Sequence, residues 1–323
     1  MNAHADNLNG HERLLVVTLS NIGDLVMTTP VFEFLATQYP QRRIDVVADQ
    51  RSAMLLRHAP YVGEIFLRKK RAPITDQLSL LRRLRRRRYL AAIDLRTPLI
   101  PYALRADMRL VKPGRKREQH AVEEHFGTVT PLAGNVRAIP ACRIYPGDAA
   151  VAVSRNWLDV LPGKRWLAVG PGANWLPKIW PRHKYRELLH RARAHFDAAI
   201  VLGSKDDCAA AHFVSQVELP VLQTAGHLNL CETAAVLKRA ECFVGNDSGL
   251  GHIAAACGTP TLTVFGPGQP QRYRPWSDHA RIVEAPGSDL AALSSEQVFE
   301  ELTDFITVYR ERNHHQSHGK AWG

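Results

Sequence analysis

The 323-residue chain has few cysteines and no long apolar run. Its five cysteines include no CxxC pair and are odd in number, which argues against a disulfide framework or a zinc site and favours reduced thiols. No apolar stretch approaches the roughly 20 residues that cross a bilayer. Residues 1–13 are polar and lack the apolar core of a signal peptide. We therefore expect a soluble, cytoplasmic protein.

The sequence also lacks a dinucleotide fingerprint and has a deficit of acidic residues. A lone glycine, Gly23, follows the first apolar run, whereas GxGxxG needs three. With 42 Lys and Arg against 31 Asp and Glu, the net charge is +11, which favours anionic partners. Nucleic acid is not expected among them, because no aromatic residues interleave with the arginine run at 82–88.

This arginine run holds the densest positive charge, with six arginines in seven residues. It continues a helical stripe formed by Ile74, Leu78, Leu81 and Leu84. A solvated helix face would explain any one of these arginines. A run of this density favours a surface that meets an anionic partner, either a membrane or a substrate.

Strand-like and helix-like segments alternate along the chain, which is typical of parallel β-α-β units. The expected buried strands are 14–19, 44–48, 89–95, 166–169, 198–202, 242–245 and 261–265. Residues 134–163 lose this rhythm, and we expect the inter-domain connection there, with a short helix over 149–158. The length suits two domains. We place them at 1–160 and 161–323, each an α/β domain with a doubly wound sheet.

Three expected strands end in polar turns, at the edge where open α/β sheets bind ligands. The most informative turn is GNDSGLGH at 245–252. Ser248, Gly249 and the following amides would begin a helix, whose N–H groups and dipole favour phosphate. Asp247 and His252 would then take ribose hydroxyls or a second phosphate. An ordinary turn with Asp247 or Ser248 as the N-cap explains the same residues.

The first strand is followed by SNIGD at 20–24 and then by Thr28, Thr29 and Pro30. A helix is expected to begin or kink at Pro30, which leaves Asp24 on irregular backbone. The Asp24 carboxylate has two interpretations. It either caps a turn or, kept ionised by helix N–H groups, accepts a proton from a hydroxyl.

The third turn, GPGANWLPKIWP at 170–181, carries a single lysine, Lys178. A partly desolvated lysine neutralises phosphate without a metal, and the contact contributes about 4 kcal/mol at an effective dielectric near 20, against about 1 in water. Packing is the alternative role for Trp175 and Trp180. For Trp180 we favour packing.

Together the three turns resemble those of glycosyltransferase family 9, the ADP-heptose:lipopolysaccharide heptosyltransferases. The resemblance runs from about residue 13 to 305, and its motifs are specific in their order and spacing rather than singly. The segments that carry it are 20–24 with 28–30, 171–173 with Lys178 and 180–181, and 245–252 with 258–260 and 265–267.

The resemblance implies a GT-B architecture, in which two Rossmann-like domains face each other across a deep cleft. Residues 1–160 would bind the acceptor and residues 161–323 the nucleotide sugar, with a helix over 295–310 packing back on the first domain. Asp24 would be the general base of an inverting transfer, and Lys178 would neutralise the donor diphosphate. No metal and no required cofactor are implied, and stimulation by a divalent cation stays open.

The substrate sites implied by the resemblance draw on all three turns and on the arginine run. The donor-binding residues would be Ala173, Asn174, Lys178, Asp247, Ser248, Gly249, Leu250 and His252. The acceptor-binding residues would be Ser20, Asn21, Gly23, Arg85 and Arg86. Many family members have threonine or serine where this chain has Ala173 and Asn174. Either Asp206 or Asp207 would serve the nucleoside.

The implied reaction moves a heptose from ADP-heptose to a hydroxyl of the lipopolysaccharide inner core, an anionic acceptor of the lipid A/Kdo type. The enzyme would associate peripherally with the cytoplasmic face of the inner membrane. Three alternatives stay open: another nucleotide sugar as donor, an epimerase or hydrolase on the same scaffold, and a non-catalytic binder of anionic polymers. The Asp24 and Lys178 turns argue against the last, because a plain binder needs neither.

Overall fold

The computed structural model describes residues 13–69, 72–96, 99–112, 114, 118–134 and 138–318. Residues 1–12, which entered the expectation about a signal peptide, lie outside this part. The chain divides into two compact units, Met1–Tyr145 and Pro146–Gly323. The division precedes the expected boundary at 160/161 because α5 (Asp148–Leu158), the short helix expected in the connection, packs on α8 (Leu230–Leu237) of the second unit.

The first unit is built on a parallel five-stranded sheet in the order β3-β2-β1-β4-β5. Its strands are β1 Arg13–Val17, β2 Arg43–Asp49, β3 Val62–Arg68, β4 Arg88–Asp94 and β5 Arg105–Val111. Its helices are α1 Ile22–Val26, α2 Thr29–Gln38, α3 Ile74–Leu84 and α4 Ala121–Phe126, with 3-10 turns η1 Ala53–Leu56, η2 Pro101–Ala103 and η3 Thr130–Leu132.

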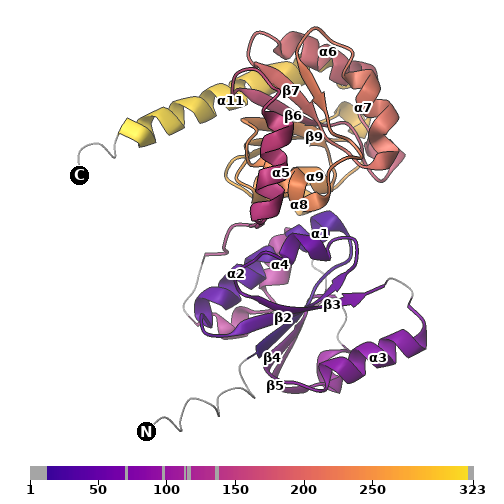
Figure 1. Ribbon diagram of the computed structural model, residues 1–323, viewed down its shortest axis with the longest axis vertical. Coiled ribbons are helices and arrows are strands. Elements are labelled where there is room, and N and C mark those ends of the chain that lie inside the picture. Colours follow the sequence, from indigo (N-terminus) through magenta and orange to yellow (C-terminus); the bar gives the residue numbers. More distant parts are fainter. Residues whose placement is uncertain are drawn as a thin grey trace. The chain divides into compact units, whose positions relative to one another are not determined.

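Alternating apolar residues give this sheet two buried faces. Leu15 and Val17 of β1 join a core cluster with Leu84 of α3, while Leu14 and Val16 are fully buried on the opposite face. Figure 1 shows α3 on one side of the sheet, with α2 and α4 on the other.

The second unit has a parallel six-stranded sheet in the order β11-β10-β9-β6-β7-β8. Its strands are β6 Trp166–Gly170, β7 Ala198–Val201, β8 Val221–Gln223, β9 Cys242–Asn246, β10 Thr261–Phe265 and β11 Ala280–Glu284. Besides α5 and α8, its helices are α6 Arg182–Ala192, α7 Cys208–Val214, α9 Gly249–Ala256, α10 Pro270–Tyr273 and α11 Ser295–His318, with 3-10 turns η4 Leu176–Lys178, η5 Lys205–Asp207 and η6 Pro286–Ser288.

One face of the second sheet is covered by α6, α7 and α11, and α5, α8 and α9 lie toward the other (Figure 1). Helix α11 begins at Ser295, as expected, and continues past 310. Its Leu302 and Ile306 are fully buried in the same core cluster as Val169 of β6 and Leu188 of α6. This helix is therefore part of the hydrophobic core of the second unit.

Both sheets place their first strand beside their fourth, β1 beside β4 and β6 beside β9, so the strand order reverses at these pairs. Ligands of open α/β sheets bind outside the carboxyl ends of the strands at such a reversal. The three polar turns singled out in the sequence follow β1, β6 and β9. The fold thus brings them to this edge in their respective units.

The structure bears on disulfides, membrane-spanning helices and metal sites in the described residues. None of the five cysteines forms a disulfide. In the described ranges, no helix combines the length and apolar character that a membrane span requires. The same ranges hold no group of three or more His, Cys, Asp or Glu side chains suited to a metal ion.

Candidate active site

In the second unit, Lys178 and Asp247 form an ion pair in which the Lys178 Nζ lies 2.5 Å from the Asp247 Oδ2. Lys178 ends η4 in the loop after β6, and Asp247 follows β9, the neighbouring strand. The Asp247 side chain is 7% exposed and that of Lys178 is 23% exposed. This pair therefore places a partly desolvated ammonium group at the carboxyl edge of the sheet, near the N-terminus of α9.

Helix α9 begins at Gly249, as the sequence predicts, and Ser248 is its N-cap residue. The Ser248 hydroxyl makes no capping hydrogen bond, and its Oγ is buried without a partner among the described residues. Capping therefore does not account for this serine. A buried hydroxyl beside the unpaired first amides of a helix is the arrangement that binds an anion.

The buried Asn246 at the end of β9 fixes the Lys178 loop. Its Oδ1 accepts hydrogen bonds from the Trp180 amide (3.0 Å) and the Tyr185 hydroxyl (2.8 Å). Its Nδ2 donates to the Pro171 carbonyl at 2.9 Å. The sequence analysis did not single out this asparagine, although it lies inside the motif at 245–252. Its side-chain amide both accepts and donates, so one buried residue bonds to several points of the loop.

Trp180 is fully buried, and its indole Nε1 donates to the Leu293 carbonyl at 3.0 Å, which confirms the packing role. Trp175 is 50% exposed in the same loop. Ala173 is half-buried and Asn174 is exposed between β6 and η4. His252 is buried within α9.

The two aspartates after β7 have different surroundings. The Asp207 Oδ2 accepts hydrogen bonds from the Ser204 amide (2.8 Å) and hydroxyl (2.7 Å), which closes a capping box around η5. A Cβ added at Gly172 would lie 2.1 Å from the Asp207 Oδ1, so only glycine fits beside this carboxylate. Asp206 is exposed and has no hydrogen-bond partner among the described side chains.

In the first unit, Asp24 lies in α1 rather than on irregular backbone. The Leu25 amide bonds to the Asn21 carbonyl and the Met27 amide to the Gly23 carbonyl, so a helical turn forms before α2 begins at Thr29. The Asn21 side chain donates to the Asp24 Oδ2 at 2.8 Å. The half-buried carboxylate occupies the first turn, where the helix dipole favours negative charge.

Three arginines that the sequence analysis did not assign lie at the carboxyl edge of the first sheet. Arg51 follows β2, Arg68 ends β3 and Arg96 follows β4. The Arg96 Nη1 donates to the Ser20 Oγ at 2.5 Å. Burial and the nearby Arg96 lower the pKa of Arg68, and one Arg68 nitrogen is buried without a hydrogen-bond partner among the described residues. The only sequence signal was that each follows or ends an apolar run.

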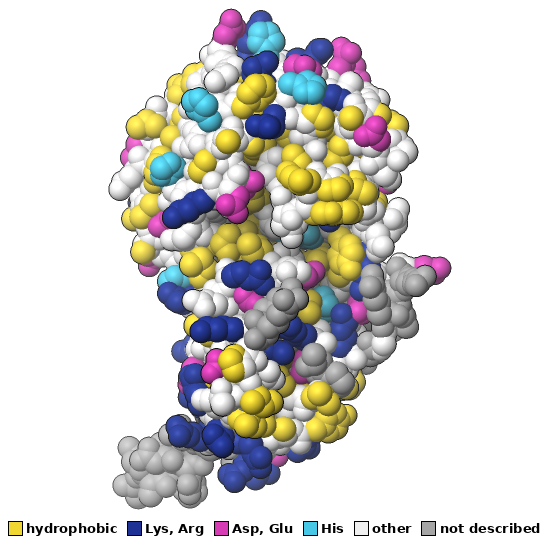
Figure 2. All heavy atoms as spheres, turned by 90° about the vertical axis from the view of Figure 1, so that its right-hand side faces the viewer, with side chains coloured by type: hydrophobic (Ala, Val, Ile, Leu, Met, Phe, Trp, Pro, Cys, Tyr) yellow, Lys and Arg dark blue, Asp and Glu magenta, His cyan; other side chains and the backbone are white. Residues whose placement is uncertain are grey.

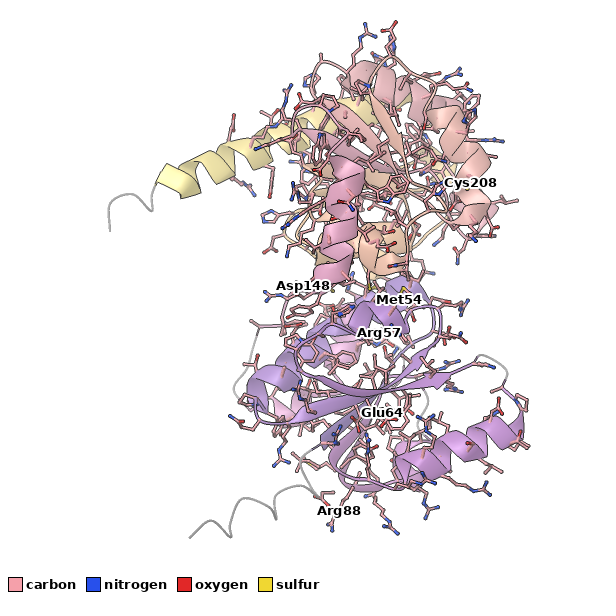
Figure 3. The ribbon with its side chains drawn as sticks, in the orientation of Figure 1. Met54, Arg57, Glu64, Arg88, Asp148 and Cys208 are labelled. Carbon is pink, nitrogen blue, oxygen red and sulfur yellow. The ribbon has the colours of Figure 1, made fainter. Side chains whose placement is uncertain are left out.

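The structure separates the acceptor residues expected from the sequence into two sets. Ser20, Asn21 and Gly23 adjoin Asp24, but Arg85 and Arg86 come just before β4 and lie at the amino edge of the sheet. Figure 3 shows Arg88 at that edge, while Met54 and Arg57, which follow β2, lie at the opposite edge beside α1. A strand of this length separates the two edges by roughly 20 Å at about 3.3 Å per residue.

Known proteins of one family are similar to this chain over most of its length. The family model described as "Glycosyltransferase family 9 (heptosyltransferase)" matches residues 101–303. Lipopolysaccharide heptosyltransferase 3 of Escherichia coli is 24% identical over 286 residues, covering 80% of this chain and 84% of the relative. Lipopolysaccharide heptosyltransferase 2 of Salmonella typhimurium is 26% identical over 312 residues, covering 84% and 87%.

The solved structure of E. coli ADP-heptose lps heptosyltransferase II superposes with a TM-score of 0.78 and 23% identity, covering 92% of this chain and 99% of the other. This likeness, with the two parallel sheets, shows the expected GT-B fold of two Rossmann-like units. The family match spans more than half of the sequence. The chain is a glycosyltransferase and belongs to glycosyltransferase family 9, the heptosyltransferase family.

Proposed function

We propose that this glycosyltransferase transfers a heptose from ADP-heptose to a hydroxyl of the lipopolysaccharide inner core, with inversion at the anomeric carbon. The observation that carries the proposal is the Lys178–Asp247 pair at the N-terminus of α9, beside a Ser248 hydroxyl that has no hydrogen-bond partner in the described part of the chain. The names of the relatives, lipopolysaccharide heptosyltransferases 2 and 3, support heptose and lipopolysaccharide as the substrates.

The second unit would bind the donor through its diphosphate. A diphosphate at α9 would accept hydrogen bonds from Ser248, Gly249 and Leu250, and Lys178 would shift from Asp247 toward the phosphate oxygens. Asp247 would then be left to accept ribose or sugar hydroxyls. Because Asp207 already closes a turn of its own, we assign the nucleoside to the exposed Asp206.

The first unit would bind the acceptor at the edge that holds Asp24. Arg51, Arg68 and Arg96 provide three guanidinium groups there, while Asp49 and Asp94 provide two of the nearby carboxylates. The unsatisfied Arg68 nitrogen supports a ligand with a carboxylate or phosphate, which arginine recognises through paired hydrogen bonds. Arg85 and Arg86 lie too far from Asp24 to contact the reacting sugar.

In the proposed step, the acceptor oxygen forms a bond to the anomeric carbon of heptose from the face opposite the diphosphate. The bond between that carbon and the diphosphate oxygen breaks, and ADP leaves with the electron pair. Asp24 takes the proton of the attacking hydroxyl. Lys178 and the α9 amides stabilise the negative charge that grows on the leaving ADP.

A transfer assay with purified protein tests the proposal. ADP release from ADP-heptose should require a Kdo-containing lipid A acceptor, and mass spectrometry should show an acceptor heavier by one heptose. ADP release without acceptor would indicate the hydrolase alternative. Turnover of a different nucleotide sugar, with none of ADP-heptose, would overturn the donor.

A further inference from the structure

The face of the first unit that carries α3 holds an apolar groove, and of its lining only Arg68 has a role in the proposed reaction. Helix α3 buries only Leu84, whereas Ile74 and Leu78, one turn apart, are 68% and 44% exposed. Leu67 of β3 is 52% exposed, and Leu99, which precedes η2, is 75% exposed. A cavity of about 490 Å³ lies between these three elements and is lined by all four exposed side chains.

Exposed apolar side chains are concentrated at this groove. Among the described residues, eight large hydrophobic side chains are strongly exposed, and four of them line this groove. Single exposed apolar residues are common on soluble proteins, but a contiguous patch marks a surface that meets another apolar phase. In Figure 2, hydrophobic side chains on the side that α3 occupies are bordered by Lys and Arg.

The arginine run at the end of α3 divides into paired and unpaired groups. Carboxylates of the same unit neutralise three of its members: Arg83 pairs with Glu64, Arg87 with Asp45 and Glu64, and Arg88 with Asp107. Arg82, Arg85 and Arg86 are exposed and form no ion pair with the described residues. Three unpaired positive charges therefore lie at the end of the apolar helix.

The groove connects this basic end to the edge that holds Asp24. Arg68, at the carboxyl end of β3, and Arg83, near the end of α3, both line it. Helix α3 runs between these points for roughly 16 Å, at about 1.5 Å for each of its residues. The one acidic side chain in the lining is Asp76, in the first turn of α3. An elongated ligand in this groove would meet apolar walls, with Arg68 near one end and Arg83, which is paired with Glu64, near the other.

We propose that this face docks on the surface of an anionic lipid bilayer. Ile74, Leu78 and their apolar neighbours enter the boundary between headgroups and acyl chains, and Arg82, Arg85 and Arg86 bind headgroup phosphates. An apolar helix face with a cationic flank binds membranes in this way. Charge complementarity favours an anionic bilayer over a second copy of the chain as the partner. The chain has a net charge of +11, and in a symmetric contact the arginines of one copy would repel the same arginines of the other.

The inference extends the proposed function, because a lipid-linked acceptor lies in such a bilayer. Docking along α3 would hold the membrane beside the groove whose far end is Arg68, next to the Asp24 edge. A headgroup sugar would then reach the acceptor site while its acyl chains stay in the bilayer. Binding to vesicles that contain no acceptor tests docking separately from transfer.

The experiment is flotation of the full chain with vesicles of phosphatidylglycerol and phosphatidylethanolamine. The triple variant Arg82→Gln, Arg85→Gln, Arg86→Gln should bind less tightly by about fivefold for each arginine at low salt, and much of this difference should vanish at high salt. The double variant Ile74→Ser, Leu78→Ser should bind about tenfold or more weakly at both salt concentrations. Vesicles of phosphatidylcholine should bind the native chain weakly.

Matched variants in the second unit provide the controls. A triple variant removes the same charge from exposed positions: Arg155→Gln, Lys238→Gln, Arg239→Gln. The variant Val160→Ser removes an apolar side chain that is 73% exposed. Both should bind vesicles like the native chain. If the charge control loses as much vesicle binding as the α3 arginine variant, net charge alone explains the binding and the assigned face is wrong. The assigned face is also wrong if both α3 variants bind vesicles like the native chain.

Two further measurements separate membrane docking from self-association and from a loss of catalysis. A native dimer that becomes a monomer in the Ile74→Ser, Leu78→Ser variant would overturn the proposal in favour of a contact between copies. Transfer to a water-soluble acceptor without acyl chains should proceed at the native rate in both α3 variants. If vesicle binding holds but no transfer to either acceptor occurs, the proposed reaction fails while docking stands.

Discussion

Lys178 combines two properties that a free surface lysine lacks: partial burial and an anionic neighbour that a substrate can replace. Its ammonium group is held by Asp247, which is 7% exposed. A diphosphate brings more negative charge than one carboxylate, so in the proposed donor site the lysine would move from Asp247 to the ligand. The ion pair therefore keeps the lysine oriented while the site is empty.

Lys178→Ala should weaken ADP binding by about 10- to 1000-fold, because a partly desolvated contact of roughly 1.4 to 4 kcal/mol is lost. Adenosine, which has no phosphate, should bind as to the native enzyme. Calorimetry with both ligands measures the difference. Lys164→Ala, an exposed lysine before β6, is the control and should change neither affinity. Equal losses for ADP and adenosine would mean that Lys178 has a structural role only.

Asp24→Asn should lower kcat by about 10²- to 10⁴-fold while ADP affinity stays near the native value. The asparagine oxygen can still accept the hydrogen bond from Asn21, so the turn should persist, but the group that takes the hydroxyl proton is lost. Steady-state kinetics and ADP calorimetry on the same preparation check the prediction. Asp159→Asn, an exposed position at the end of α5, should leave kcat unchanged. A near-native kcat in Asp24→Asn would reduce Asp24 to a turn residue.

At the scale of elements, the buried Asn246 side chain bonds to both ends of the loop between β6 and α6. Asn246→Ala should lower the free energy of unfolding by roughly 2 to 4 kcal/mol, because it leaves the Trp180 amide and the Tyr185 hydroxyl without their buried acceptor. Urea denaturation measures this loss. Asn174→Ala, exposed on the same loop, should cost little. A loss equal to that of Asn174→Ala would show that the loop relaxes around the gap.

Two neighbouring arginines just after α3, Arg86 and Arg87, should contribute unequally to stability. Arg87→Gln should lower the free energy of unfolding by roughly 1 to 3 kcal/mol, because the Asp45 side chain is fully buried and loses its partner at 2.6 Å. Arg13 and the Glu64 amide still bond to Asp45, which limits the loss. Arg86→Gln, exposed and without an ion pair, should be within about 0.5 kcal/mol of the native chain in the same denaturation measurement. Indistinguishable variants would show that the Asp45 network adds little.

The buried elements could be predicted from the sequence, and the edge elements could not. The strands 14–19 and 242–245 are mostly apolar, and 44–48 is apolar except for Asp45, because helices cover both faces of a central parallel strand. The outer strands β3, β5, β8 and β11 were not predicted. Charged residues such as Glu64 and Arg109 interrupt them, since side chains at the sheet edge reach water.

Part of the candidate site could likewise be predicted from the sequence, and part could not. The turns after β1, β6 and β9 follow strongly apolar strands, so Asp24, Lys178 and Ser248 stood out. Arg68 did not, because it ends β3, which was not predicted, and Arg51 did not, because the sequence does not show that β2 and β3 are neighbours. The assignment of Arg85 and Arg86 to the acceptor rested on charge density alone, and the structure places them at the edge of the sheet opposite Asp24. Charge density along a chain does not tell which edge of a sheet it occupies.

At the scale of the whole molecule, the net charge of +11 is distributed over distinct tasks rather than one. In the proposed function, the Lys178 turn would bind a diphosphate, and the cluster of Arg51, Arg68 and Arg96 would bind a carboxylate or phosphate of the acceptor. The unpaired arginines after α3 remain for a surface. An anionic ligand of one unit should therefore stabilise the protein independently of an anionic ligand of the other unit.

At the same scale, we predict that the whole chain binds adenine nucleotides rather than uridine or cytidine nucleotides. ADP and ADP-heptose, each at 100 times its Kd, should stabilise the native state by about 2.7 kcal/mol, because they bind the folded protein and not the unfolded chain. Thermal denaturation of the full chain measures this shift for ADP, UDP and CMP sugars in parallel. Inorganic diphosphate is the control for charge alone, and its shift at the ADP concentration should be smaller because it lacks the adenosine contacts. Stabilisation by UDP or CMP sugars, with none by adenine nucleotides, would reject ADP-heptose as the donor.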